Sequence, residues 1–208
     1  MDLDAILQLG PVMPVIVIDE AEHAVPLADA LLAGGIKAIE ITLRTQNALE
    51  VIRAIASERP ELAIGAGTIL GADQAQAAKQ AGAQFAVSPG ATDAVLQGCR
   101  DVDLPLLPGA ATVSEMMSLA EKGYHNLKFF PAVASGGLAY VKSLASPLPH
   151  LKICPTGGIT LQTAPEWLAL DNIICVGGSW IAPRNMIAEG SFLAITERAA
   201  AAQALKKA

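Results

Sequence analysis

Short apolar runs alternate with longer alanine-rich stretches along the whole chain. Each run is rich in Val, Ile, Leu or Phe, and a loop with Gly, Pro or Thr follows it. This alternation is typical of strands followed by helices, and roughly eight such units can be counted. The predicted strands are Val12–Ile18, Ile36–Ile41, Leu62–Ala66, Phe85–Ser88, Leu104–Leu107, Asn126–Phe130, Leu151–Cys154 and Ile173–Val176.

Helices are predicted between these strands, and their ends carry recognisable signals. Thr112 with Glu115, and Thr163 with Glu166, match the capping box that begins a helix. Glycines at 34, 35 and 82 stand where a left-handed cap ends one. The helices expected from these signals and from composition include Glu22–Ala33, Asn47–Glu58, Asp73–Ala81 and a last one in the tail Ala199–Ala208.

Strands that alternate with helices run parallel and are joined by right-handed crossovers. Eight repeats favour closure into a barrel, with an open doubly wound sheet as the alternative. The length of 208 residues is enough for one sizeable core and lies at the low end for such a barrel. The sequence therefore predicts an α/β fold, a single (β/α)8 TIM barrel with an extra N-terminal helix, as one domain over residues 1–208.

Composition narrows the class of protein. The chain is 52% hydrophobic and only 16% charged, which is too apolar for a disordered protein. No apolar run reaches membrane-spanning length, so no membrane association is expected. The first residues, Met1-Asp2-Leu3-Asp4, are acidic and no cleavable apolar segment follows them. We therefore expect a cytoplasmic protein.

The net charge and the positions of the cysteines and histidines argue against nucleic-acid binding and against a metal site. The net charge of −6 and the scattered Lys and Arg argue against a nucleic-acid partner, which needs a basic face. The three cysteines, Cys99, Cys154 and Cys175, form no CxxC pair and are predicted to be buried, reduced thiols. The histidines, His23, His125 and His150, are isolated from one another, so no metal is expected.

Glu40 is the first candidate for chemistry. Alternation along the second strand places Ile39 and Ile41 against the helices, whereas Glu40 and Arg44 face the lumen, the space that the strands enclose, and its mouth. A carboxylate inside a barrel is costly unless it is paired or takes part in a reaction. Glu40 is therefore a catalytic candidate, and a structural ion pair with Arg44 or with a lysine is the alternative.

Lys128 is the second candidate, because it lies within the strongly apolar strand Asn126–Phe130. Lys128 and Phe130 share the face opposite Leu127 and should point inward. An ammonium among apolar groups loses hydration, which favours the neutral amine that can attack a carbonyl. The alternatives are a snorkelling lysine or a salt bridge to Glu40.

Two glycine pairs follow the last two strands, at Gly157-Gly158 and Gly177-Gly178. Barrels commonly bind phosphate there, where bare backbone N–H groups converge on the anion. Tight turns without a ligand are the alternative for either pair. The third glycine-rich segment, Gly65–Thr68, does not match a dinucleotide fingerprint, because Leu70 stands where its third glycine is required.

Together these segments resemble the 2-keto-3-deoxy-6-phosphogluconate (KDPG) aldolase family. The resemblance runs in order from about Gly10 to Pro183. Its motifs are Glu40-Ile41-Thr42-Leu43-Arg44, Gly65-Ala66-Gly67-Thr68, Ser88-Pro89-Gly90, Lys128-Phe129-Phe130-Pro131, Cys154-Pro155-Thr156-Gly157-Gly158-Ile159 and Gly177-Gly178-Ser179-Trp180.

The resemblance implies a class I aldolase of the Entner-Doudoroff pathway that uses neither metal nor other cofactor. It implies that Lys128 forms a Schiff base and that Glu40 shuttles protons. It further implies a homotrimer that acts on a small phosphorylated 2-keto acid and releases pyruvate and glyceraldehyde 3-phosphate. The implied substrate-binding residues are Arg44, Thr68, Pro89, Phe130 and Thr156, and the implied phosphate-binding residues are Gly157, Gly158, Gly178 and Ser179.

The sequence departs from the family pattern at one place, and alternatives to the aldolase reaction and to its substrate stay open. Pro131-Ala132-Val133 stands in place of the Pro-Ala-Glu run of many family members, which bears on sugar specificity. A phosphosugar isomerase or decarboxylase, with Glu40 as its base, would share the glycine turns. A non-catalytic phosphosugar-binding regulator would leave both lumen charges without a role. Within the aldolase reading, the rival substrates are 2-keto-4-hydroxyglutarate (KHG) and the galactonate epimer of KDPG.

Overall fold

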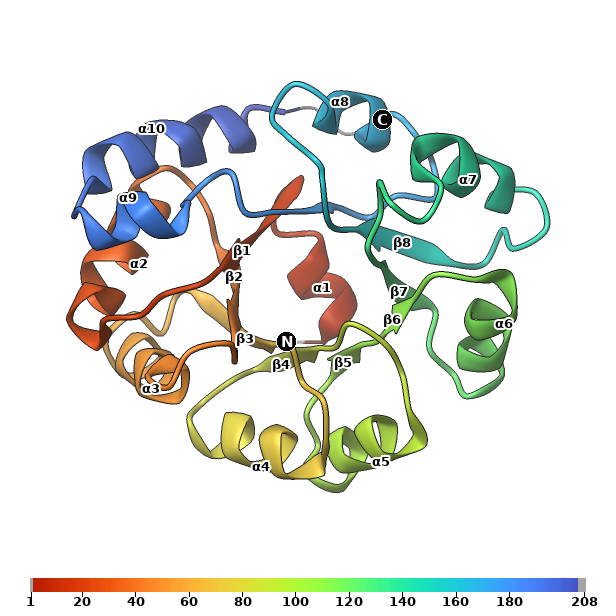
Figure 1. Ribbon diagram of the computed structural model, residues 1–208, viewed down its shortest axis with the longest axis horizontal. Helices are drawn as coiled ribbons and strands as arrows, with labels where there is room; N and C mark the ends of the chain where they lie inside the picture. The colour runs from red at the N-terminus through yellow and green to blue at the C-terminus, as the bar shows by residue number, and fades with distance from the viewer. Residues whose placement is uncertain (1, 206–208) are drawn as a thin grey trace.

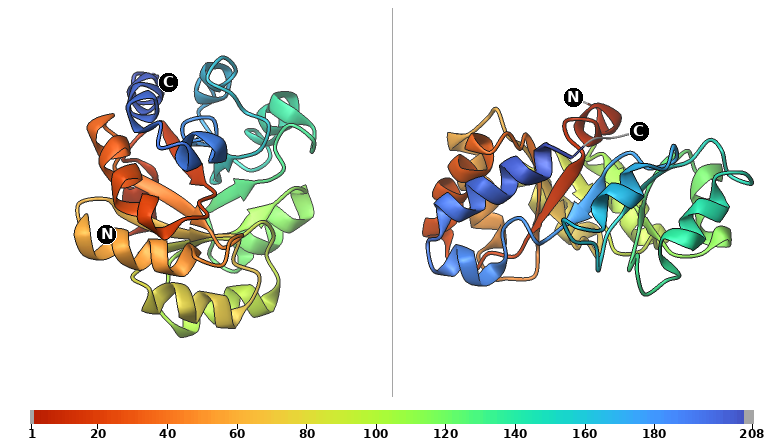
Figure 2. Two further views of the ribbon diagram at one scale, coloured as in Figure 1. Left: turned by 60° about the vertical axis from the view of Figure 1, so that its left-hand side comes forward. Right: turned by 90° about the horizontal axis from the view of Figure 1, so that it is seen from above.

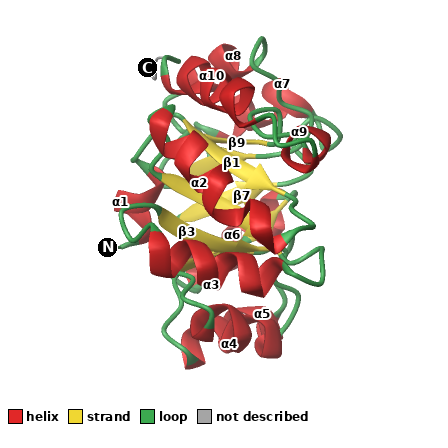
Figure 3. Cartoon of the chain, turned by 90° about the vertical axis from the view of Figure 1, so that its left-hand side faces the viewer, coloured by secondary structure: helices red, strands yellow, loops and turns green. Residues whose placement is uncertain are grey.

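This computed structural model describes residues 2–205 of the chain. These residues form parallel strands surrounded by helices (Figures 1 and 3). The strands are β1 Val12–Ile16, β2 Ala38–Thr42, β3 Ala63–Gly67, β4 Phe85–Val87, β5 Leu106–Leu107, β6 Gly109–Ala110, β7 Asn126–Phe129, β8 Lys152–Pro155 and β9 Val176–Gly178. The helices are α1 Leu3–Leu7, α2 Ala24–Ala33, α3 Ala48–Glu58, α4 Ala72–Gln80, α5 Asp93–Asp101, α6 Val113–Glu121, α7 Gly137–Leu144, α8 Ala164–Leu168, α9 Arg184–Ala188 and α10 Phe192–Gln203, with a short 3-10 helix at Ala21–His23.

The predicted strands overlap the observed ones, with shifts of a few residues at their ends. The largest shift concerns the run Ile173–Val176, because β9 begins only at its last residue. Ile173 instead forms an isolated parallel bridge with Ile153. The predicted tail helix belongs to α10, and residues 206–208 lie outside the described part of the chain.

The prediction of a closed eight-stranded TIM barrel is wrong. Six strands form one sheet in the order β5-β4-β3-β2-β1-β9, which makes a half-barrel, and β6-β7-β8 form a separate small sheet. Pro108 separates β5, which pairs with β4, from β6, which pairs with β7. Since proline has no N–H to donate to a strand, it is a natural point for the chain to change its pairing partner. Between β8 and β9, only the isolated bridges Ile153–Ile173 and Thr156–Gly177 join the two sheets.

Two buried clusters follow from the period-two alternation of the strands. As predicted, Ile39 and Ile41 belong to the large cluster between strands and helices, whereas Ala38 belongs to a smaller one in the lumen. The lumen cluster consists of Ile6, Leu7, Met13, Ala38, Ala63, Phe85, Val87, Leu107, Cys154, Ile174 and Cys175. Helix α1 lies across the end of the lumen where the strands begin (Figures 1 and 2) and buries Ile6 and Leu7 there.

Helix ends confirm most of the predicted caps. Thr112 and Glu115 form the complete capping box of α6. Gly35 and Gly82 have φ angles of 87° and 99°, the left-handed conformation that glycine adopts without strain. The capping box predicted at Thr163 is wrong, since that residue already has a helical backbone and its hydroxyl contacts Thr160.

Candidate active site

Glu40 lies at the centre of β2 with its side chain in the lumen. It is 2% exposed. The neighbouring strand β3 leaves room for the carboxylate at Gly67, where a Cβ atom would overlap Glu40 Oε1. The absence of a side chain at position 67 is therefore a requirement for the observed position of Glu40.

Lys128 lies on β7, and its ammonium meets Glu40 inside the lumen. Lys128 Nζ is 3.2 Å from Oε1 and 3.3 Å from Oε2 of Glu40. Lys128 is 3% exposed, so both charges have left water and each is compensated mainly by the other. The ammonium also lies 5.3 Å from the centre of the Phe130 ring, within the range of a cation–π contact.

This contact is also what a purely structural salt bridge predicts, so the geometry alone does not assign a reaction to it. The other structural alternative, a pair between Glu40 and Arg44, is wrong. Arg44 is exposed and donates from Nε to Thr68 Oγ1 at 3.0 Å. Glu40 and Lys128 therefore form a pair that is separate from Arg44.

Arg44 and Thr68 follow the carboxyl ends of two neighbouring strands, β2 and β3. Thr68 has a φ of 62°, which is an unfavourable conformation for a β-branched residue. The hydrogen bond from Arg44 fixes its hydroxyl in that position. A guanidinium and a hydroxyl held together at the mouth of a lumen suit a planar carboxylate.

The two glycine turns lie next to each other at the same end of the strands. The bridge between Thr156 and Gly177 aligns them, because Gly157 and Gly178 are the next residues on each side. Gly157 and Gly158 have φ angles of 106° and 81°, which explains why glycine is required at both. Gly178 is covered by the ring of Trp180, and Ser179 is exposed beside it.

Phe130 lies against Lys128, and Pro89 lies beside the strand that pairs with the lysine strand. The backbone of Pro89 lies against Gly109, where a Cβ would overlap it, and Gly109 is the register partner of Lys128. A Cβ at Gly157 would lie 3.5 Å from the Phe130 ring. These contacts connect the lysine strand to the Ser88-Pro89-Gly90 segment and to the first glycine turn.

Sequence reasoning missed the roles of Gly67, Gly177 and Cys154. At Gly177 a Cβ would overlap Thr156 Oγ1, so this glycine makes room for Thr156. Cys154 is the register partner of Lys128 on β8, and its sulfur lies 4.0 Å from Thr156 Oγ1. All three depend on contacts between neighbouring strands, which a single sequence does not display.

The predicted isolation of the histidines holds in part. The rings of His125 and His150 lie edge to face, 5.9 Å apart, and His23 contacts Phe192. Among residues 2–205, no three His, Cys, Asp or Glu side chains gather as a metal-binding group. No helix in this range has both the length and the apolar character needed to cross a membrane.

Fold and site together define a class: parallel α/β proteins whose lumen holds a buried Lys–Glu pair beside two adjacent glycine turns. The chain belongs to the KDPG and KHG aldolase family, whose model matches residues 3–198. The resemblance stated from the sequence motifs is thereby confirmed.

Relatives and solved structures agree with this assignment. The chain is 46% identical over 196 residues to the KHG/KDPG aldolase of Escherichia coli strain K12, which covers 94% of this chain and 92% of that protein. It is 47% identical to the 2-dehydro-3-deoxy-phosphogluconate aldolase of Dickeya dadantii, over 93% of this chain and 91% of the relative. The KDPG aldolase of Legionella pneumophila, captured with pyruvate as a covalent carbinolamine intermediate, superimposes with a TM-score of 0.95 at 43% identity, covering 98% and 99% of the two chains.

Proposed function

We propose that this chain is a class I aldolase, a carbon–carbon lyase that cleaves KDPG to pyruvate and glyceraldehyde 3-phosphate. A second reaction is the cleavage of KHG to pyruvate and glyoxylate. The contact between Lys128 Nζ and Glu40, inside a chain of this aldolase family, is the observation that carries the proposal. The carbinolamine in the Legionella relative supports covalent chemistry of this kind.

The buried pair explains how a lysine becomes a nucleophile. A proton that moves from the Lys128 ammonium to the Glu40 carboxylate leaves a neutral amine and a neutral acid, which suits a water-poor lumen. The amine attacks the C2 carbonyl and gives a carbinolamine. Glu40 then returns its proton to the departing hydroxyl, so that water leaves and a protonated imine remains.

The imine is the electron sink for cleavage. Glu40, again a carboxylate, removes the proton of the C4 hydroxyl through a water molecule, and the electrons of the C3–C4 bond move towards the imine nitrogen. The aldehyde leaves and an enamine remains on Lys128. Glu40 protonates this enamine at C3, and hydrolysis releases pyruvate and restores the ammonium.

Substrate orientation follows from the ends of the strands. Arg44 and Thr68 are proposed to hold the carboxylate, because their hydrogen bond presents a guanidinium and a hydroxyl together. Pro89, Phe130 and Thr156 are proposed as the walls around the reacting carbons. Backbone N–H groups of the glycine turns and the Ser179 hydroxyl are proposed to bind the phosphate; the residues concerned are Gly157, Gly158, Gly178 and Ser179.

Family membership favours the aldolase over an isomerase, a decarboxylase or a binding regulator.

The assembly and the location of the protein are also part of the proposal. A homotrimer is expected from the family resemblance, and light scattering of the purified protein tests it. A cytoplasmic location is expected because a multiply charged phosphorylated acid does not cross a membrane unaided.

The decisive experiment is imine trapping. The protein is incubated with pyruvate and borohydride and digested, and the reduced adduct is located by mass spectrometry. We expect the adduct on Lys128 and none in Lys128→Met. Binding of phosphorylated keto acids without any adduct would instead support the isomerase alternative.

A further inference from the structure

A pair of thiols lies in the lumen next to the Lys–Glu pair. Cys175 Sγ donates a hydrogen bond to Cys154 Sγ at a distance of 3.5 Å. Both residues are buried, at 1% and 2% exposure, and both belong to the lumen cluster. The reaction derived above uses neither sulfur.

Two neighbouring segments of the backbone carry the cysteines. Cys154 lies on β8, and Cys175 immediately precedes β9. Bridges at Ile153–Ile173 and Thr156–Gly177 lie on either side of both positions, so the two cysteines lie on neighbouring segments. Neighbouring strands lie about 4.8 Å apart, which is within the Cα separation of about 4.4–6.8 Å that a disulfide spans.

Cys154 also has the electrostatic surroundings of a reactive thiol. The hydrogen bond from Cys175 is the largest influence and lowers the pKa of Cys154, against the opposing effect of burial. The positive charge of Lys128 lowers this pKa further, and the negative charge of Glu40 acts against it. Cys99 is the internal contrast, because burial alone raises the pKa of that thiol to about 11. Since the thiolate is the nucleophile, Cys154 should react with an oxidant before Cys99 does.

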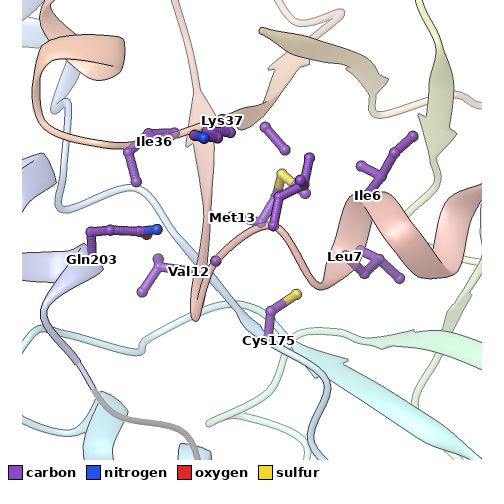
Figure 4. A pocket seen from close by; sticks show the side chains of 11 residues that line it. Ile6, Leu7, Val12, Met13, Ile36, Lys37, Cys175 and Gln203 are labelled. Atoms are coloured by element: carbon purple, nitrogen blue, oxygen red, sulfur yellow. The ribbon is translucent and has the colours of Figure 1, made fainter. Parts of the chain in front are cut away.

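A small cavity at the end covered by α1 reaches Cys175 but not Cys154 (Figure 4). Its volume is about 10 Å³, near the lower limit for one water molecule. Cys175, Leu7 and Met13 are among its lining residues. Hydrogen peroxide is larger than water and does not fit this cavity, so it has to reach Cys154 by the route that the keto acid takes to Lys128, the register partner of Cys154.

We propose that Cys154 and Cys175 form a thiol–disulfide site that hydroperoxides oxidise, and that the disulfide slows the reaction at Lys128. The second half of this inference rests on the proposed function. The Cys154 thiolate attacks one peroxide oxygen, the O–O bond breaks, and a sulfenic acid and one water result once a proton is taken up. The Cys175 sulfur then attacks the sulfenic sulfur, and the released hydroxide leaves with the Cys175 proton as a second water. Two electrons pass from the two sulfurs to the peroxide.

The disulfide changes the lumen beside the reacting lysine. An S–S bond is about 2.05 Å long, so the two sulfurs must approach each other by roughly 1.5 Å from their present separation. This movement draws the Cys154 sulfur towards Cys175, and Cys154 is the register partner of Lys128. Because a misplacement of about 1 Å near reacting groups can cost about a hundredfold in rate, we expect at least about a tenfold loss of turnover in the oxidised protein.

The test exposes the wild type and the variants Cys99→Ser, Cys154→Ala and Cys175→Ala to hydrogen peroxide. Remaining thiols are alkylated under denaturing conditions, and intact mass, peptide mapping and aldolase activity are recorded before and after dithiothreitol. Each activity is normalised to the untreated sample of the same variant. Thermal melts establish that every variant is folded.

In the wild type and in Cys99→Ser we expect a loss of two hydrogen masses, a crosslinked pair of peptides containing Cys154 and Cys175, and inhibition that dithiothreitol reverses. In Cys154→Ala and Cys175→Ala we expect no crosslink and no reversible inhibition. Oxidation of the wild type without that crosslink overturns the site, and a complete crosslink at unchanged activity overturns its effect on Lys128. The mass readout needs no activity, so a failure of the proposed aldolase function is recognised separately.

Discussion

Glu40 Oε1 and Lys128 Nζ lie 3.2 Å apart in the lumen, although the two residues are 88 positions apart in the sequence. Neither side chain is more than 3% exposed, so water contributes little to their stability there. The same closeness lets a proton pass from Lys128 to Glu40 in the first step of the proposed cycle, and it keeps Glu40 beside the imine for the later proton transfers.

Replacement of Glu40 by glutamine tests this proton transfer. The amide of Glu40→Gln keeps the shape of the side chain but accepts no proton, so we expect kcat to fall by roughly 10²–10⁴-fold. The borohydride adduct with pyruvate should form more slowly but still on Lys128. Kinetic assays together with time-resolved trapping measure both effects, and near-normal turnover would show that another group moves the protons.

Replacement of Gly67 by alanine tests the positioning of Glu40. The added methyl group would overlap Glu40 Oε1 and displace the carboxylate from Lys128. We expect kcat to fall by about a hundredfold, with little change in KM, because a shift of about 1 Å is enough for such a loss. Gly71→Ala is the matched control, since a Cβ there meets nothing within 4 Å. Equal activities of Gly67→Ala and Gly71→Ala would contradict the requirement for a glycine at position 67.

Replacement of Val133 by glutamate tests the electrostatics of the first glycine turn. Val133 is 52% exposed, and its side chain would lie 2.8 Å from a Cβ at Gly158. A carboxylate there should repel the substrate phosphate by about 1 kcal/mol and raise KM for KDPG about fivefold. Val133→Gln provides a neutral control of the same size. The difference between the two variants should shrink at high salt, and a difference independent of salt would argue against this cause.

The capping box of α6 predicts a dependence of stability on pH. Backbone N–H groups, first that of Ala111, donate to Glu115 and hold its pKa below the ordinary value of 4.5. A depressed carboxyl pKa contributes stability above pH 4.5, and this contribution is lost as the pH falls through the lower, folded-state pKa. Glu115→Gln should therefore be less stable than the wild type at pH 7 and no less stable once Glu115 is protonated.

Thr112→Ala is the contrast for this measurement. The threonine hydroxyl does not titrate, so its removal should lower the free energy of unfolding by about 1 kcal/mol at all pH values at which the chain folds. Urea titrations of the three proteins across the acid range make the comparison. If Glu115→Gln is still less stable than the wild type at the lowest pH, the loss of stability does not come from the charge of the Glu115 carboxylate.

Chelation tests the expected independence of metal. In the proposed mechanism the Lys128 imine accepts the electrons of the broken bond, which is the task a metal performs in other aldolases. We expect dialysis against EDTA to leave turnover unchanged. Loss of activity that a divalent cation restores would require a different mechanism.

Local patterns predicted the elements well because strand alternation and caps act over a few residues. The inward direction of Glu40 and Lys128 followed from period two, and the capping box at Thr112 followed from spacing. The prediction of a closed barrel was wrong, because local patterns do not show which strands form hydrogen bonds with each other on the two sides of Pro108. The clearance at Gly67 and the contact between Cys154 and Cys175 also arise between neighbouring segments of the fold, each pair separated in sequence by a helix.

The break at Pro108 has a mechanical consequence for the reaction. Glu40 belongs to the half-barrel and Lys128 to the small sheet, so the two reacting groups are carried by two bodies. The chain passes between these bodies at Pro108 and again between β8 and β9, where the isolated bridges lie. The distance between Glu40 and Lys128 therefore depends on how the half-barrel and the small sheet pack against each other. Substitutions of the buried residues of α6 or α7 should alter turnover by shifting the small sheet as a unit.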